Sequence, residues 1–182
     1  MDRRSLLGTC TAGTMGALAG CLGTILTSET ATSELDTDDV DEERSASGYH
    51  GWFDIDHDEA TAVSAAEIGD GPGTHHVYLF VASDNPVPVE IDVVVDSDSL
   101  LGGSSETIRS ESVDLEIGRY VYYHFTVEAA YWLDVSLEGH DLELEIEKDH
   151  IEASGGSYMR GSNQAFCVWP DGEVEEVGGI DD

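Results

Sequence analysis

Alternation of apolar and polar residues dominates the chain from Gly73 onward, and no other feature constrains the fold as much. Short runs carry an apolar side chain at every second position, and turn residues such as Asp84-Asn85-Pro86 and Pro170-Asp171-Gly172 separate them. Successive side chains of a strand point to opposite faces, so each run predicts a strand with one buried face. The apolar positions of these runs are Val77, Leu79, Val81, Val89, Ile91, Val93, Val95, Val113, Leu115, Ile117, Val121, Tyr123, Phe125, Val127, Leu133, Val135, Leu137, Leu142, Leu144 and Ile146.

About seven to eight short strands of this kind predict an all-β fold, an antiparallel sandwich of two sheets. The predicted sandwich spans residues 49–182, because a chain of 182 residues has room for one domain and a tail. The segment Asp58–Ile68 fits either a short helix that ends at Gly69 or an edge strand.

Charge sets the conditions under which such a domain can fold. The chain has 39 acidic and 7 basic residues and a formal net charge of −32. The resulting repulsion is strong in dilute salt and largely screened in molar salt, where the Debye length falls to about 3 Å. We therefore predict a salt-adapted protein, and we exclude nucleic acid as a partner because the few cations cannot neutralise a polyanion.

The first 20 residues have the three parts of an export signal. Arg3 and Arg4 precede a weakly apolar stretch, and the string Leu18-Ala19-Gly20-Cys21 follows it. Small residues before a cysteine are typical of a lipoprotein signal, so we predict cleavage after Gly20 and lipidation of Cys21. The alternative is an uncleaved membrane helix over Leu6–Leu26, which the many glycines of this stretch disfavour.

The export route follows from the paired arginines. The string from Asp2 to Leu7 is similar to a twin-arginine signal, although Asp2 and Leu6 depart from the commonest residues of that motif. The general secretory route is the alternative. Removal of residues 1–20 takes away Arg3, Arg4 and the single acid Asp2, which leaves a mature chain with a formal charge of −33.

Residues 21–48 are predicted to be a lipidated cysteine followed by a disordered stalk. The stalk is rich in Ser, Thr, Asp and Glu, and its run Asp36–Glu43 is almost entirely acidic. Such a run repels itself and stays extended. Its predicted function is to hold the domain away from the membrane.

The twin-arginine signal, Leu18-Ala19-Gly20-Cys21, the acidic stalk and the compact acidic sandwich together resemble the surface lipoproteins of halophilic archaea, many of them uncharacterised. The resemblance implies an extracytoplasmic domain held by lipid on the outer face of the cell membrane, and an immunoglobulin-like order of strands. It implies no activity. Cys167 would be the single thiol of the mature domain, so the Cys-Trp-Cys core of antibody domains is missing.

Candidate chemistry is sparse. A blue-copper site needs a His and usually a Met shortly after its Cys, and neither follows Cys167, which we interpret as a small core residue. The run Asp54–Asp58 begins like a calcium loop but has Glu59 where the loop needs Gly. The seven His have no metal-binding spacing, and no nucleophile elbow is present. We therefore predict no catalytic residue, metal or cofactor. A small secreted hydrolase and a metal or redox carrier are the alternatives.

An aromatic face is the most informative candidate for binding. If Val77 and Val121 face the core, the residues next to them face away from it. The immunoglobulin-like order that the resemblance implies would make the strands near His76–Val81 and Tyr120–Val127 paired neighbours. The predicted binding face consists of Tyr78, Phe80, Tyr120, Tyr122 and Trp132. Its partner would be a protein or a glycan. The alternative is that Trp52-Phe53 or the segment Asp58–Ile68 covers this face. The sequence thus predicts a membrane-anchored surface binding module.

Overall fold

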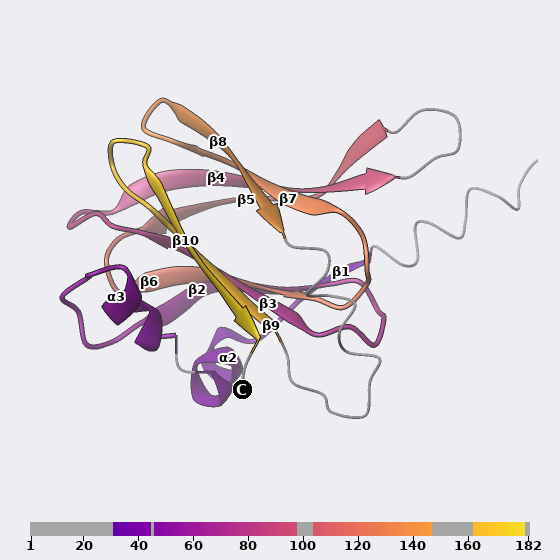
Figure 1. Ribbon diagram of the computed structural model, residues 1–182, viewed down its shortest axis with the longest axis horizontal. Helices are drawn as coiled ribbons and strands as arrows, with labels where there is room; N and C mark the ends of the chain where they lie inside the picture. Colours follow the sequence, from indigo (N-terminus) through magenta and orange to yellow (C-terminus); the bar gives the residue numbers. More distant parts are fainter. Residues whose placement is uncertain (1–30, 45, 98–103, 147–161, 181–182) are drawn as a thin grey trace, which may run out of the picture.

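Two facing β-sheets form the body of the protein in the computed structural model, which describes residues 31–44, 46–97, 104–146 and 162–180 (Figure 1). The large sheet has six strands in the order β1-β2-β6-β3-β9-β10. These are β1 (Thr32–Glu34), β2 (Thr61–Ile68), β6 (Arg119–Phe125), β3 (His75–Val81), β9 (Ser162–Val168) and β10 (Val174–Ile180). The small sheet has four strands in the order β5-β4-β7-β8. These are β5 (Ser104–Leu115), β4 (Val87–Ser97), β7 (Tyr131–Leu137) and β8 (His140–Ile146).

The all-β, two-sheet architecture is confirmed, and three details of the prediction are wrong. The described residues contain ten strands, not seven or eight. The large sheet is mixed, because β2 pairs with β6 and β3 pairs with β9 in parallel. The ambiguous segment contributes β2, which is a strand but not an edge strand, since β1 pairs with its other side. The purely antiparallel prediction failed because strand patterns do not report the direction of a neighbour.

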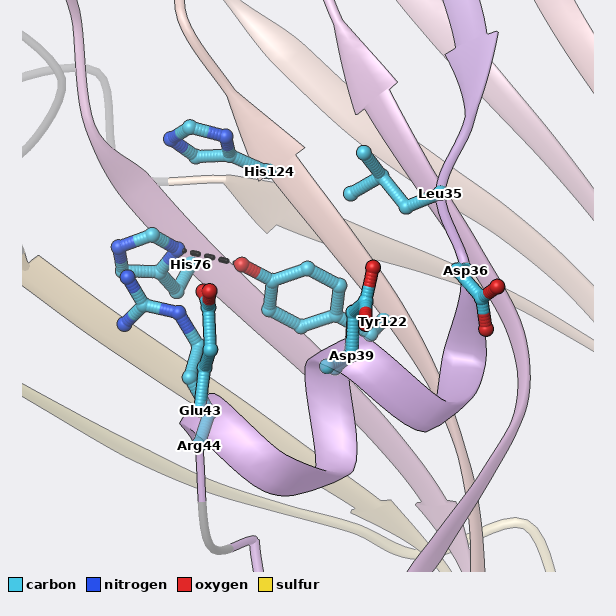
Figure 2. A pocket seen from close by; sticks show the side chains of 9 residues that line it. Leu35, Asp36, Asp39, Glu43, Arg44, His76, Tyr122 and His124 are labelled. Atoms are coloured by element: carbon cyan, nitrogen blue, oxygen red, sulfur yellow. Dashed lines mark hydrogen bonds between the residues drawn. The ribbon is translucent and has the colours of Figure 1, made fainter.

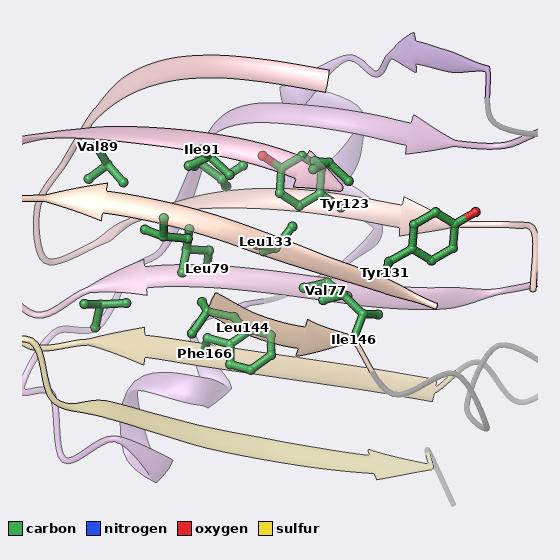
Figure 3. Packing of buried hydrophobic residues seen from close by; sticks show 14 of the residues in the cluster. Val77, Leu79, Val89, Ile91, Tyr123, Tyr131, Leu133, Leu144, Ile146 and Phe166 are labelled. Atoms are coloured by element: carbon green, nitrogen blue, oxygen red, sulfur yellow. The ribbon is translucent and has the colours of Figure 1, made fainter. Parts of the chain in front are cut away.

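The main core lies between the sheets and uses the alternating positions (Figure 3). Along β7, Tyr131, Leu133, Val135 and Leu137 are buried while the residues between them are half-buried or exposed. β4 pairs with β5 on one side and with β7 on the other, so its valines and Ile91 lie at the centre of the small sheet. Each fully buried aliphatic or aromatic side chain contributes roughly 1.5–3 kcal/mol. This layer therefore holds the two sheets together.

Polar side chains cross between the sheets at their edges. On one side, Arg109 of β5 donates to Glu34 of β1 (2.6 Å) and to Glu111 (3.1 Å). Glu111 also accepts hydrogen bonds from Ser64 of β2 and Tyr123 of β6. We call these five residues the Arg109 latch.

Gln164 of β9 performs the same task on the opposite side. Its Nε2 donates to the Glu145 carbonyl of β8 (3.0 Å) and to the Glu176 carboxylate of β10 (2.8 Å). Each side of the sandwich is therefore bridged by hydrogen bonds as well as by apolar packing.

A second layer covers the outer face of the large sheet. Two short helices, α2 (Thr37–Glu43) and α3 (Gly48–Trp52), lie on this face (Figure 1). α2 begins where the Asp36 side chain accepts from the Asp38 N–H (3.0 Å), and Asp38 and Asp39 occupy the first turn, where negative charge is favourable. Val40 of α2 and Phe53 after α3 are buried against the sheet.

This layer corrects the predicted stalk. Residues 31–44 are not a disordered linker, because β1 pairs with β2 and α2 packs on the sheet. Asp41 of α2 accepts from the Ala62 N–H (3.0 Å) and from the Tyr120 hydroxyl (2.6 Å). The few apolar residues of the segment, with these hydrogen bonds, are enough to dock it. Residues 21–30, the start of the predicted stalk, lie outside the described residues, and within the described part no helix has the length and apolar character to cross a membrane.

Candidate functional site

The predicted pairing of the two aromatic strands is confirmed, but the face they form is not exposed. β3 and β6 are antiparallel neighbours, with Tyr78 opposite Tyr122 and Phe80 opposite Tyr120. All four side chains are buried, at 4%, 3%, 1% and 0% relative exposure respectively. They belong to the second core layer, under Val40, Ala46, Phe53 and Ile55. The exposed aromatic binding face is therefore corrected to a buried one.

Trp132 is not part of this layer. It lies on β7 in the small sheet, opposite Val94 and Glu145, and is half-buried. The prediction failed here because alternation assigns a residue to a face of its strand but not to a sheet. The predicted cover was half correct: Phe53 is buried at 1% exposure, whereas Trp52 is 72% exposed.

The remaining predicted site residues divide into two groups. Arg3, Arg4, Leu18, Ala19, Gly20 and Cys21 lie outside the described residues. Cys167 is described and fully buried in β9, as a core residue should be. Burial, with the charge of Glu175, raises the pKa of its thiol to about 12, so the thiol is protonated and unreactive at neutral pH.

A cleft opens where α2 leaves one end of the aromatic layer uncovered (Figure 2). It has a volume of about 300 Å³, and we call it the α2 cleft. Strands β3 and β6 supply its floor, and α2 with its flanking residues supplies its wall. The lining residues are Leu35, Asp36, Asp39, Val40, Glu43, Arg44, His76, Tyr122 and His124.

Two imidazoles stack in the floor of the cleft. His76 and His124 are directly opposite each other in the β3–β6 register, and their ring centroids are 4.7 Å apart. His76 Nδ1 is 2.8 Å from the Tyr122 hydroxyl, in the hydrogen bond that Figure 2 marks with a dashed line, and its Nε2 is 3.0 Å from the Thr74 hydroxyl. Both ring nitrogens of His76 are thus hydrogen-bonded.

His124 is held at one nitrogen only. Its Nδ1 lies 3.2 Å from Glu67 Oε2, and since an ionised carboxylate only accepts, Nδ1–H donates. In the neutral ring, Nε2 is then a hydrogen-bond acceptor. It is buried and has no hydrogen-bond partner in the described part of the chain. A buried polar atom without a partner is unusual and calls for an explanation.

Both imidazoles are neutral at pH 7. Burial, together with the charges of Arg44, His124 and His75, lowers the pKa of His76 to about 3. Burial also lowers the pKa of His124, with Arg44 acting in the same direction and Glu67 in the opposite one. The charge of Arg44 is therefore felt by both rings.

Arg44 is the cation of this site. It is the C-cap of α2, where its backbone N–H donates to the Val40 carbonyl. Among the described residues its guanidinium forms no ion pair, although the chain has 39 acidic residues. Asp39 and Glu43, on the same helix, line the cleft as well, so the wall carries both signs of charge.

Sequence reasoning found part of this site and missed the rest. Alternation places His76 and His124 on the same face as Tyr122. The contribution of α2 was missed, although Asp36 followed by two acids is a signal for a helix N-terminus. Within the described residues, no group of three His, Cys, Asp or Glu side chains is arranged to hold a metal ion. Comparison of the chain with protein-family models, with curated proteins and with solved structures found no match.

Proposed function

We propose that this chain is a membrane-anchored lipoprotein of a halophile whose extracytoplasmic domain, an immunoglobulin-like sandwich, binds a small polar ligand in the α2 cleft. The observation that supports binding is that Arg44, whose guanidinium forms no ion pair with a described residue, and His124, whose Nε2 has no hydrogen-bond partner among them, line the same cleft. Ligand sites are concave and present a few converging polar groups, which describes this cleft.

The protonation state of His76, in the floor of the cleft, favours binding over catalysis. A general base works best when its pKa lies near the operating pH. His76 has a pKa of about 3 and both of its nitrogens are hydrogen-bonded, so it is a poor base. Its better use is to orient the Tyr122 hydroxyl at the cleft.

A binding screen tests the proposal. The full chain in molar KCl would be heated with representatives of several classes of small polar compound, and the unfolding midpoint recorded. We expect at least one class to raise the midpoint of the wild type, because a ligand that binds only the folded state stabilises it. The rise should be lost in Arg44→Gln and kept in Arg119→Gln, a matched change at the exposed first residue of β6. No rise for any class would contradict binding.

The anchor is tested separately. The signal residues Arg3 and Arg4 and the string Leu18-Ala19-Gly20-Cys21 support export and lipidation. We expect Cys21→Ser to release the protein to the medium or to leave the precursor unprocessed. Lysine at both Arg3 and Arg4 should block export through the twin-arginine route. Cleaved Cys21→Ser protein that stays in the membrane fraction would show that the anchor is not a lipid on Cys21.

A further inference from the structure

The α2 cleft offers binding groups for both signs of charge within a small volume. Arg44 supplies a guanidinium, Asp39 and Glu43 supply carboxylates, and His124 Nε2 supplies a neutral acceptor. Resting on the proposed function, we infer that the ligand is a small zwitterion with adjacent ammonium and carboxylate groups, as in a free α-amino acid with an apolar side chain.

The carboxylate of such a ligand would be bound by Arg44. A guanidinium binds a carboxylate through two parallel N–H donors, and this is the pairing that Arg44 lacks among the described residues. The Tyr122 hydroxyl can add a third donor. When Thr74 donates to His76 Nε2, His76 Nδ1 donates to the Tyr122 oxygen and leaves the Tyr122 proton available.

The ammonium group would be bound by the acceptors of the same site. Neutral His124 has a lone pair at Nε2 that no described residue hydrogen-bonds, and a ligand N–H would provide a partner for it. Glu43 lies next to Arg44 in the sequence and also lines the cleft, so a carboxylate and a guanidinium are both available to one small ligand.

A ligand with one charge fits this arrangement less well. A simple anion paired with Arg44 would face the carboxylates of Asp39 and Glu43, and a simple cation paired with those acids would face Arg44. A zwitterion satisfies both groups at once. Leu35 and Val40 add an apolar part to the wall, and the volume of about 300 Å³ suits one small molecule.

Three probe compounds that share the same apolar side chain separate these cases. L-leucine carries both charges, 3-methylbutylamine lacks the carboxylate and 4-methylpentanoate lacks the ammonium group. Titration calorimetry of the full chain in molar KCl should show binding of L-leucine that is at least about tenfold tighter than that of either analogue, because a charge-assisted hydrogen bond is usually worth a factor of ten or more. Arg44→Gln and Glu43→Gln should each weaken the binding of L-leucine by about tenfold, while Arg119→Gln should leave it unchanged. Circular dichroism would confirm that each variant is folded.

The outcomes distinguish this inference from the proposed function. Equal binding of 4-methylpentanoate and L-leucine would identify an anion site, and equal binding of the amine would identify a cation site; either overturns the zwitterion. L-leucine binding that survives Arg44→Gln in a folded variant overturns it too. If no probe binds, but a compound from the broader screen stabilises the wild type and not Arg44→Gln, the cleft is a binding site for another ligand. If nothing binds in either experiment, the proposed function fails as well.

Discussion

Replacement of Arg109 by Met tests whether the Arg109 latch stabilises the fold. The change removes a cation that donates to Glu34 (2.6 Å), to Glu111 (3.1 and 3.3 Å) and to Ser64 (3.4 Å). The side chains of Arg109 and Glu111 are each only 11% exposed, whereas Glu34 is 73% exposed. The loss of stability should therefore come mainly from the buried partner, Glu111, which is left without its cation.

The magnitude follows from the fate of Glu111. Breaking a buried ion pair at one partner costs about 3–5 kcal/mol, because a buried charge is left uncompensated. Two hydroxyl donors, Ser64 and Tyr123, still bind Glu111 and reduce this cost. The exposed pair with Glu34 adds under about 1 kcal/mol. We expect Arg109→Met to lower the free energy of unfolding by about 3 kcal/mol, a large part of the 5–15 kcal/mol typical of a domain.

Urea denaturation of the full chain in molar KCl measures this loss, because urea leaves the ionic strength unchanged. Arg119→Met is the matched control, and an exposed substitution of this kind should change stability by under about 0.5 kcal/mol. Adding Glu111→Gln to Arg109→Met should restore part of the stability, since it removes the uncompensated charge. A loss no larger than that of Arg119→Met would refute the reasoning.

The pH dependence provides a second check on the same pair. Burial alone would raise the pKa of Glu111, but hydrogen bonds from Arg109, Ser64 and Tyr123 and the charge of Arg109 hold it below its ordinary value of 4.5. In the wild type this depressed pKa contributes stability above pH 4.5 that is lost as the pH falls through the folded-state pKa. Without Arg109 the pKa of Glu111 should rise above 4.5. Protonation of Glu111 on acidification should then remove the uncompensated charge and part of the variant's loss of stability. The difference between the two proteins should therefore be largest near pH 7 and shrink toward pH 4.

Three further predictions concern the salt dependence of the domain, a strained glycine and the buried thiol. Circular dichroism should show loss of structure as KCl falls below a few tenths molar, with partial rescue by acid; an unchanged signal down to about 10 mM, where the Debye length is roughly 30 Å, would contradict the repulsion argument. Gly118→Ala should cost roughly 1 kcal/mol more in urea denaturation than Gly139→Ala, because both have positive φ (+84° and +89°) but only the Cβ at Gly118 would meet His57, at 2.6 Å. A maleimide should label Cys167 only when the protein is unfolded, since the thiol is buried and its pKa is raised to about 12; labelling of the native protein at the same rate would contradict this.

Much of the strand layout could be predicted from the sequence, because burial of one face leaves a direct trace in alternation. The β3–β6 pairing was also predicted, from the immunoglobulin-like order of strands that the resemblance implies. Alternation does not report which strands lie side by side in a sheet, or in which of the two sheets a strand lies. The parallel pairing of β9 with β3, and the passage of the chain from β6 in the large sheet to β7 and Trp132 in the small one, leave no trace in any local pattern.

The α2 cleft was harder to predict because its wall is built from acidic residues that look like a solvated linker. Asp36 caps the helix, and Asp41 binds both a strand N–H and the Tyr120 hydroxyl. Each of these roles is specific, yet composition cannot distinguish an aspartate with a structural role from one that is only exposed to solvent. Apolar content was equally misleading, since α2 buries one residue, Val40, and relies on the Asp41 hydrogen bonds for the rest of its docking.

In a chain of this composition the basic residues are therefore more informative than the acidic ones. Thirty-nine acids make any carboxylate near a given site unremarkable, whereas five basic residues follow Cys21. Three of them lie in the described part, and two of these have distinct positions: Arg109 at the latch and Arg44 at the cleft. A surface cation in such a chain would be expected to find a carboxylate by chance. Arg44 has none among the described residues, and its charge lowers the pKa of two neutral imidazoles. For this reason the proposed ligand site is the cleft and not the acidic surface.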